Sequence, residues 1–170
     1  MSSADRQIEY AVPGATPEQA EFEQLMRRQA VQALALGQAA GEVVGLNATQ
    51  INCLNLIALE GPMTAGQIAA GIGLTTASTT AVLDKLEAEG YVQRERDPND
   101  RRRVTVSINM ERAMAEISPL FLPLTQSRTR LLGNHTPEQV NLILDFIREN
   151  TRILAEAVER LRAMSPRRKS

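Results

Sequence analysis

Residues 97–104 read DPNDRRRV, a short stretch in which three arginines stand beside two aspartates and a Pro-Asn turn. Guanidinium groups form paired hydrogen bonds with carboxylates and with phosphates, so this stretch has two chemical uses. It is either a solvated turn whose charges pair with one another, or a basic loop that contacts an anionic partner. The elements on either side of it bear on that choice.

Two runs of alternating apolar and polar residues flank this turn and predict a β-hairpin. Residues 91–96 (YVQRER) and 103–108 (RVTVSI) have the period of two that is typical of strands with one packed face. The charged stretch then forms the tip of the hairpin. Four tip residues are candidate contacts for a partner: Asp100, Arg101, Arg102 and Arg103.

Three helices are predicted before the hairpin. Asn47 opens the first with a capping-box pattern, and Thr64 opens the second. A tight turn at 73–75 leads into the third, which spans 75–90 and ends at Gly90. Three helices followed by a hairpin form a winged helix-turn-helix. In that fold the helix after the turn fits the major groove of DNA, and the hairpin reaches the neighbouring minor groove.

A heptad pattern runs through the last helix, which the motif TPEQ opens at 136–139. From its first turn, mostly apolar residues recur at alternating spacings of four and three, as in a coiled-coil seam. The seam comprises Val140, Leu144, Ile147, Thr151, Leu154, Val158 and Leu161. An N-terminal helix opens with the same motif at 16–19 and carries Phe22 and Leu25 on its apolar stripe. The seam packs on this helix, on a second copy of the chain, or on both.

The sequence therefore predicts a mainly α fold of the α+β winged helix-turn-helix class, whose N- and C-terminal helices form a homodimerisation domain. The run 111–132 is expected to be helical but kinked or broken by Pro119 and Pro123. The expected layout is a flexible arm (1–15), a dimerisation helix (16–45), the winged helix-turn-helix (46–110), C-terminal dimerisation helices (111–164) and a disordered tail (165–170).

Three motifs between residues 46 and 108 stand in the order and spacing of a known family: GPMTAGQIA, GLTTASTTAVLDKLEAEGYVQR and DPNDRRRV. With them, this part of the chain resembles the MarR family of bacterial transcriptional regulators. The resemblance implies a homodimer on a pseudo-palindromic DNA operator, usually a repressor that a small molecule or oxidation releases. It also implies that the exposed start of the recognition helix carries Thr75, Thr76, Ala77, Ser78 and Thr80.

The predicted recognition helix has little positive charge of its own. Relatives often carry Lys or Arg at the positions of Thr76 and Ala81, whereas Lys85 is the one basic residue of this helix. Hydroxyl and methyl groups are then expected to read the base edges. Three of the six basic residues between positions 45 and 108 are the arginines of the wing tip. The wing is therefore expected to supply much of the electrostatic attraction to DNA.

Other classes of site are not favoured by the sequence. Cys53 has apolar neighbours and no nearby base, so a buried structural thiol is expected, with a redox role as the alternative. One histidine, His135, and one cysteine do not make an ordinary zinc site. No catalytic set, metal or cofactor is expected, and the chain is not expected to be an enzyme.

The expected partners are double-stranded DNA, a second copy of the chain and a small-molecule effector that the sequence does not identify. Few aromatic residues are present, so an effector pocket is expected to have a mainly aliphatic lining. No membrane partner is expected, because no apolar run reaches about 18 residues, and the N-terminal residues do not resemble a secretory signal. A cytoplasmic location is expected. A winged helix that binds protein instead of DNA remains the alternative.

Overall fold

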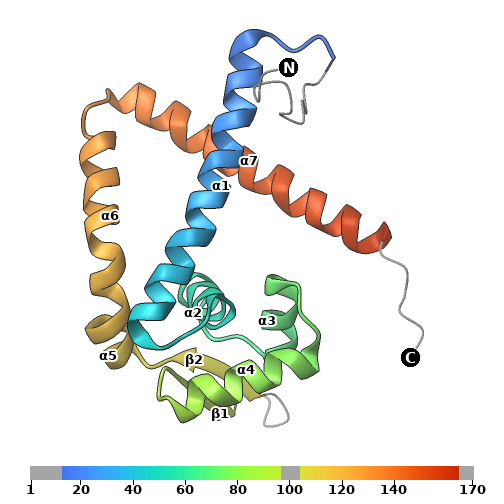
Figure 1. The fold of residues 1–170 in the computed structure, drawn as a ribbon, viewed down its shortest axis with the longest axis vertical. Coiled ribbons are helices and arrows are strands. Elements are labelled where there is room, and N and C mark those ends of the chain that lie inside the picture. Colours follow the sequence, from blue (N-terminus) through green and yellow to red (C-terminus); the bar gives the residue numbers. More distant parts are fainter. Residues whose placement is uncertain (1–12, 97–103, 165–170) are drawn as a thin grey trace, which may run out of the picture. The chain divides into compact units, whose positions relative to one another are not determined.

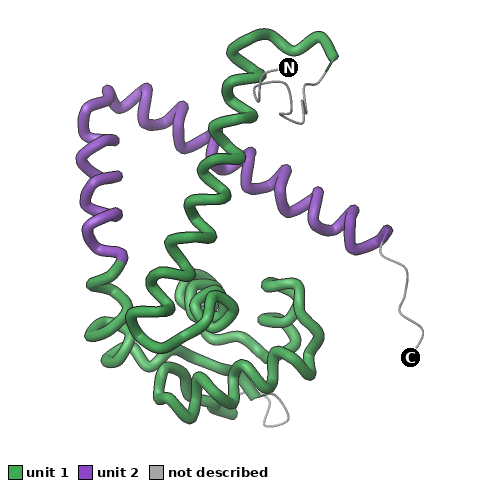
Figure 2. The backbone as a smooth tube through the Cα atoms, viewed as in Figure 1, with its two compact units in different colours: residues 1–120 green, residues 121–170 purple. Residues whose placement is uncertain are grey.

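The computed structural model describes residues 13–96 and 104–164. The chain divides into two compact units, residues 1–120 and 121–170 (Figure 2). Within the described ranges, no helix combines the length and the apolar character that crossing a membrane requires.

The first unit contains a set of helices and a two-stranded hairpin (Figure 1). In chain order it comprises α1 (Pro17–Val44), α2 (Ala48–Glu60), α3 (Ala65–Ile72), α4 (Thr76–Ala88), β1 (Val92–Arg96), β2 (Val104–Ile108), α5 (Met110–Arg112) and a π-helical turn, η2 (Ala113–Ile117). Helix α6 (Ser118–Leu132) begins in this unit and continues into the second, which also contains α7 (Pro137–Met164).

Capping boxes form at the starts of α1, α2 and α3. In α2, the Asn47 side chain accepts a hydrogen bond from the Gln50 backbone N–H at 3.0 Å, and the Gln50 side chain accepts one from the Asn47 N–H at 2.9 Å. Thr16 and Thr64 take part in the same reciprocal arrangement. Each box satisfies two backbone donors that the first helical turn leaves without partners, so these predicted helix starts are confirmed.

Gly90 ends α4 and turns the chain directly into the wing. Its φ of 77° is left-handed, a conformation that glycine adopts without a Cβ penalty. The Gly90 N–H donates to the Glu87 carbonyl at 2.9 Å, and the Tyr91 N–H donates to the Leu86 carbonyl at 2.8 Å. This pair of bonds is a Schellman motif, and it brings β1 back along the helix that it follows.

The hairpin is joined to the helical core by backbone and side chains. Strands β1 and β2 pair antiparallel from Val92 opposite Ile108 to Arg96 opposite Val104. Met63, between α2 and α3, adds two further backbone hydrogen bonds to Val106, of 3.1 and 2.7 Å. The buried core draws on these helices and on both strands: Ile51, Leu54, Ile57, Ile68, Leu83, Leu86, Val92 and Val106. The predicted winged helix-turn-helix fold is thereby confirmed.

The segment after the hairpin is helical without the predicted break. The Ser118 N–H donates to the carbonyl of Ala113, five residues earlier, which makes η2 a wide π-type turn. This turn directly precedes Pro119, which has no N–H to donate, and it lets the helix continue as α6. Pro123 lies inside α6. The expectation that the prolines break this run is wrong.

Candidate nucleic-acid interface

Helix α4 buries one side in the core and exposes the other. Thr79, Leu83 and Leu86 are fully buried, and they fix the rotation of the helix about its axis. The residues predicted to contact DNA from this helix and its cap are all exposed: Thr75, Thr76, Ala77, Ser78, Thr80 and Lys85. The core therefore orients α4 so that these side chains face outward.

Local hydrogen bonds limit what three of these hydroxyl groups are able to do. Thr75 is the N-cap of α4, and its Oγ1 accepts from the Ser78 N–H at 3.2 Å and donates to Ser78 Oγ at 2.9 Å. The Thr80 hydroxyl donates to the Thr76 carbonyl at 2.9 Å. Thr75 and Thr80 are thus left as acceptors, suited to a base amino group, whereas the Ser78 proton remains available for an acceptor such as a phosphate oxygen.

Arg94 of β1 pairs with two carboxylates of α4, a relationship that residue spacing did not predict. Its Nη2 lies 2.6 Å from Oδ1 of Asp84, and its Nη1 lies 2.5 Å from Oε2 of Glu87. Its backbone N–H also donates to Oε1 of Glu87 at 3.3 Å. Burial of the guanidinium opposes its charge, but the Asp84 hydrogen bond and the nearby charges of Glu87 and Asp84 raise the pKa of Arg94 above its ordinary value.

The third acidic residue near the end of α4 also has a partner within the fold. Gln50 is buried in α2, and its side-chain amide donates to Oε2 of Glu89 at 3.4 Å. All three carboxylates that follow the exposed start of α4 are therefore held by groups of the same unit. A residue-by-residue charge count of the helix overstates the negative charge that it presents.

The predicted wing-tip residues lie outside the described residues: Asp100, Arg101, Arg102 and Arg103. The last described pair of the hairpin is Arg96 opposite Val104, and the tip connects these two positions. The tip residues remain predictions.

A second polar cluster links the base of the wing to the helices that follow. The Tyr91 ring is buried, its hydroxyl donates to Oε2 of Glu116 at 2.5 Å, and the Arg112 guanidinium lies 4.6 Å from the ring centroid. Arg112 Nε lies 3.2 Å from Oε1 of Glu116. Asn109 caps α5 through its side chain, and its backbone N–H donates to the Tyr91 carbonyl at 2.9 Å. Tyr91 thereby connects the end of α4 to α5 and η2.

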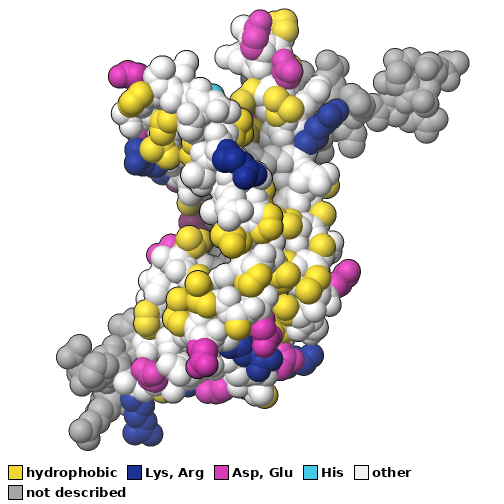
Figure 3. All heavy atoms as spheres, turned by 90° about the vertical axis from the view of Figure 1, so that its left-hand side faces the viewer, with side chains coloured by type: hydrophobic (Ala, Val, Ile, Leu, Met, Phe, Trp, Pro, Cys, Tyr) yellow, Lys and Arg dark blue, Asp and Glu magenta, His cyan; other side chains and the backbone are white. Residues whose placement is uncertain are grey.

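The residues predicted to form the dimer interface are largely exposed in the single chain. On α1, Phe22 is half-buried and Leu25 is exposed. On α7, Val140 is half-buried, and the other apolar seam residues are between 37% and 65% exposed: Leu144, Ile147, Leu154, Val158 and Leu161. One face of the molecule shows hydrophobic side chains that reach the surface between charged ones (Figure 3).

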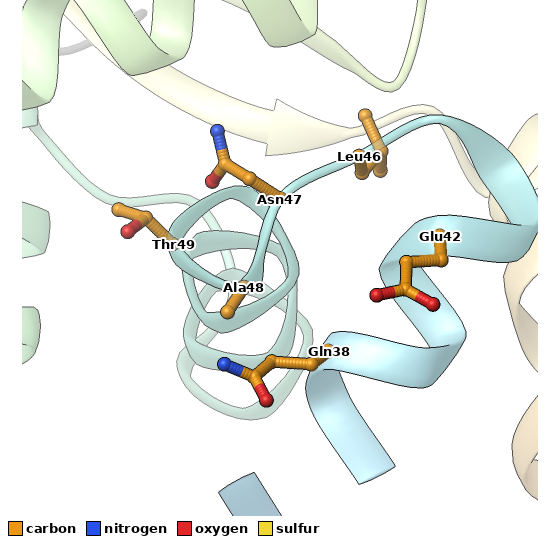
Figure 4. Close-up of a pocket in the computed structure, with 6 residues that line it drawn as sticks. All are labelled: Gln38, Glu42, Leu46, Asn47, Ala48 and Thr49. Carbon is orange, nitrogen blue, oxygen red and sulfur yellow. The ribbon is translucent and has the colours of Figure 1, made fainter. Parts of the chain in front are cut away.

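An open hollow lies where α1 passes into α2 (Figure 4). Four polar side chains line it, with Leu46 and Ala48: Gln38, Glu42, Asn47 and Thr49. This lining differs from the mainly aliphatic one expected for an effector pocket.

Neither Cys53 nor His135 has the surroundings of a reactive or metal-binding group. The Cys53 side chain is 0% exposed, and burial raises the pKa of its thiol to about 11, so the predicted buried thiol is confirmed. The exposed His135 makes a 2.9 Å hydrogen bond from Nδ1 to the Leu131 carbonyl, which helps to end α6. In the described part of the chain, no three potential His, Cys, Asp or Glu ligands gather at one place.

The MarR family model matches residues 46–104, which include the helix-turn-helix and most of the wing. A longer match is to the uncharacterized HTH-type transcriptional regulator YcgE of Bacillus subtilis (strain 168). The two are 39% identical over 139 residues, which cover 82% of this chain and 90% of that protein. The chain belongs to the MarR family. Members of this family are transcriptional regulators with a DNA-binding winged helix.

Solved structures of MarR proteins share the fold of this chain. A MarR family transcriptional regulator from Silicibacter pomeroyi has a TM-score of 0.64 and 22% identity, over 86% of this chain and 99% of that one. A mutant of S. aureus MepR bound to an oligodeoxyribonucleotide has a TM-score of 0.51 and 16% identity, over 85% of this chain and 98% of that one. At these identities the likeness concerns the fold.

Proposed function

We propose that this MarR-family regulator binds double-stranded DNA as a homodimer, with α4 in the major groove and the wing in the adjacent minor groove. The observation that carries the proposal is the exposed side of α4, formed by Thr76, Ala77 and Thr80, on a helix whose other side the core fixes. The MepR relative of the same fold was solved with bound DNA, which supports this use of the fold.

The contacts are proposed to divide into reading and attraction. Thr75, Thr76, Ala77, Ser78 and Thr80 would meet base edges or phosphates, and Lys85 would contact the backbone of the DNA. Arg101, Arg102 and Arg103 would supply attraction from the wing, with Asp100 bracing one of them. Residues 46–110 would form the DNA-binding segment in this scheme.

Homodimerisation is proposed to occur through residues 16–45 and 111–164. The exposed heptad seam of α7 supports it, because five large apolar side chains at coiled-coil spacing become shielded from water when a second helix packs on them. A two-fold dimer presents two recognition helices to successive turns of DNA, about 34–36 Å apart. Replacing Leu154 by Glu should therefore convert the dimer to monomer in sedimentation experiments, whereas Glu156→Lys, a charge change at an exposed position of the same helix, should not.

Regulation is proposed to be repression in the cytoplasm, relieved by a small molecule at a site not yet identified. Release by oxidation of the chain's one cysteine is not favoured, because Cys53 is fully buried and its pKa is raised.

The test is selection of DNA by the purified protein from a pool of duplexes with a randomised central region. Retained sequences should contain two inverted half-sites with centres about 10 base pairs apart, and footprinting should show two protected major grooves. Failure to retain any duplex at low salt would favour a winged helix that binds protein, and the function proposed here would be wrong.

A further inference from the structure

Arg94 pairs with the two carboxylates that continue the row of proposed DNA contacts along α4. Thr76, Thr80 and Asp84 follow one another at four-residue spacing, and Glu87 lies three residues further on. Residues at these spacings share one side of a helix. Both threonines are exposed, and the two carboxylates are 60% and 38% exposed. Unpaired, they would place two negative charges beside the proposed path of the phosphates.

The geometry of Arg94 is suited to cancelling these charges. Its two terminal nitrogens each reach a different carboxylate, at 2.6 Å for Asp84 and 2.5 Å for Glu87. Its backbone N–H holds the second oxygen of Glu87, so the strand itself joins the contact. The guanidinium side chain is 27% exposed, and its charge is directed toward α4.

We propose that Arg94 serves DNA binding by neutralising Asp84 and Glu87, and that it does not contact a phosphate itself. Repulsion between a carboxylate and a phosphate at a protein surface costs on the order of 1 kcal/mol, so unmasking two carboxylates is expected to weaken binding about tenfold. This inference rests on the proposed DNA-binding function, and it deepens that function by assigning a role to a residue of the wing.

Four proteins separate the two roles of the arginine: the wild type, Arg94→Gln, Asp84→Asn/Glu87→Gln, and the variant with all three changes. The probe is the duplex that the wild type retains from the randomised pool. The expected result is that Arg94→Gln binds about tenfold more weakly than the wild type, whereas the triple variant returns to within about threefold of it. Removing the carboxylates rescues the affinity because there is then no charge left to mask.

A phosphate contact gives a different pattern. Arg94→Gln would then weaken binding equally with and without the two carboxylates, and it would flatten the salt dependence by about 0.9 in both backgrounds. That result would overturn the proposal, as would unchanged affinity of Arg94→Gln. Arg96→Gln removes the same charge from the same face of β1, and as the matched control its effect should not depend on the two carboxylates.

Thermal unfolding of each variant sets a temperature for titration at which all of them are folded. If Arg94→Gln does not fold, the Asp84→Asn/Glu87→Gln pair with and without Arg94 decides the matter. Similar affinity of these two proteins supports the proposal, and clearly tighter binding by the one with arginine overturns it. If the wild type retains no duplex, the proposed function fails first, and this inference fails with it.

Discussion

The Tyr91 hydroxyl donates a 2.5 Å hydrogen bond to Glu116, which joins the end of the recognition helix to the first turns of the helix that leads into the second unit. Replacing Tyr91 by Phe keeps the buried ring but removes the donor. We expect a decrease of about 1.5 kcal/mol in the free energy of unfolding, because the bond is made to a charged group. Urea unfolding of the wild type, both single variants and the double variant with Glu116→Ala measures it. Decreases that simply add would show that the two groups do not interact.

The same hydrogen bond predicts a dependence of stability on alkaline pH. Burial and the hydrogen bond to Glu116 raise the pKa of Tyr91 above its ordinary value, so the folded protein holds this proton more tightly than the unfolded chain does. The stabilisation is complete below about pH 10, the pKa of an unfolded tyrosine, and is lost as the pH rises above it. The wild type should therefore lose more stability between neutral and alkaline pH than Tyr91→Phe does. Parallel stability curves for the two proteins would contradict this.

Gly41 in α1 is required for close packing. A Cβ at this position would lie 2.3 Å from the backbone oxygen of Leu46, which cannot move away as a flexible side chain would. Glycine to alanine in a helix ordinarily stabilises by roughly 0.5–1 kcal/mol, and here we expect the opposite sign. Gly37→Ala in the same helix is the matched control, because nothing lies within 4 Å of its Cβ position. Thermal unfolding midpoints should fall for Gly41→Ala and rise slightly for Gly37→Ala, and a rise for both would disprove the clash.

Cys53 is expected to be inert in the folded protein. Raising the pKa of the thiol from 9.0 to about 11 lowers its reactive thiolate fraction near neutral pH by about 100-fold, and the side chain is 0% exposed. Labelling by a thiol reagent should be slow in native buffer and fast in concentrated urea. Rapid labelling of the native protein would reopen a redox role for this residue.

Local sequence signals predicted most of the fold. Thr16, Asn47 and Thr64 each cap a helix with a partner three residues away, and the end of α4 needs only Gly90 and its neighbours. Such contacts depend on residue type and spacing alone, so a sequence is enough to place them. The exposed start of α4 follows in the same way from the period of its buried side.

Contacts between separate elements were not predictable from the same signals. Arg94 meets Asp84 across a helix and a strand, and Tyr91 meets Glu116 from 25 residues away. Both depend on how the hairpin folds back on α4, which residue spacing does not give. The proline rule failed at Pro119 because the π-type turn before it absorbs the missing donor.

The central claim is that this MarR protein binds DNA with its wing supplying much of the electrostatic attraction. The direct measurement is the affinity of the wild type and of Arg101→Ala/Arg102→Ala for the selected duplex over a series of salt concentrations. We predict weaker binding by the variant and a salt dependence flatter by about 0.9 for each phosphate that the wing no longer neutralises. Equal affinity and an equal salt slope for the two proteins would contradict this claim.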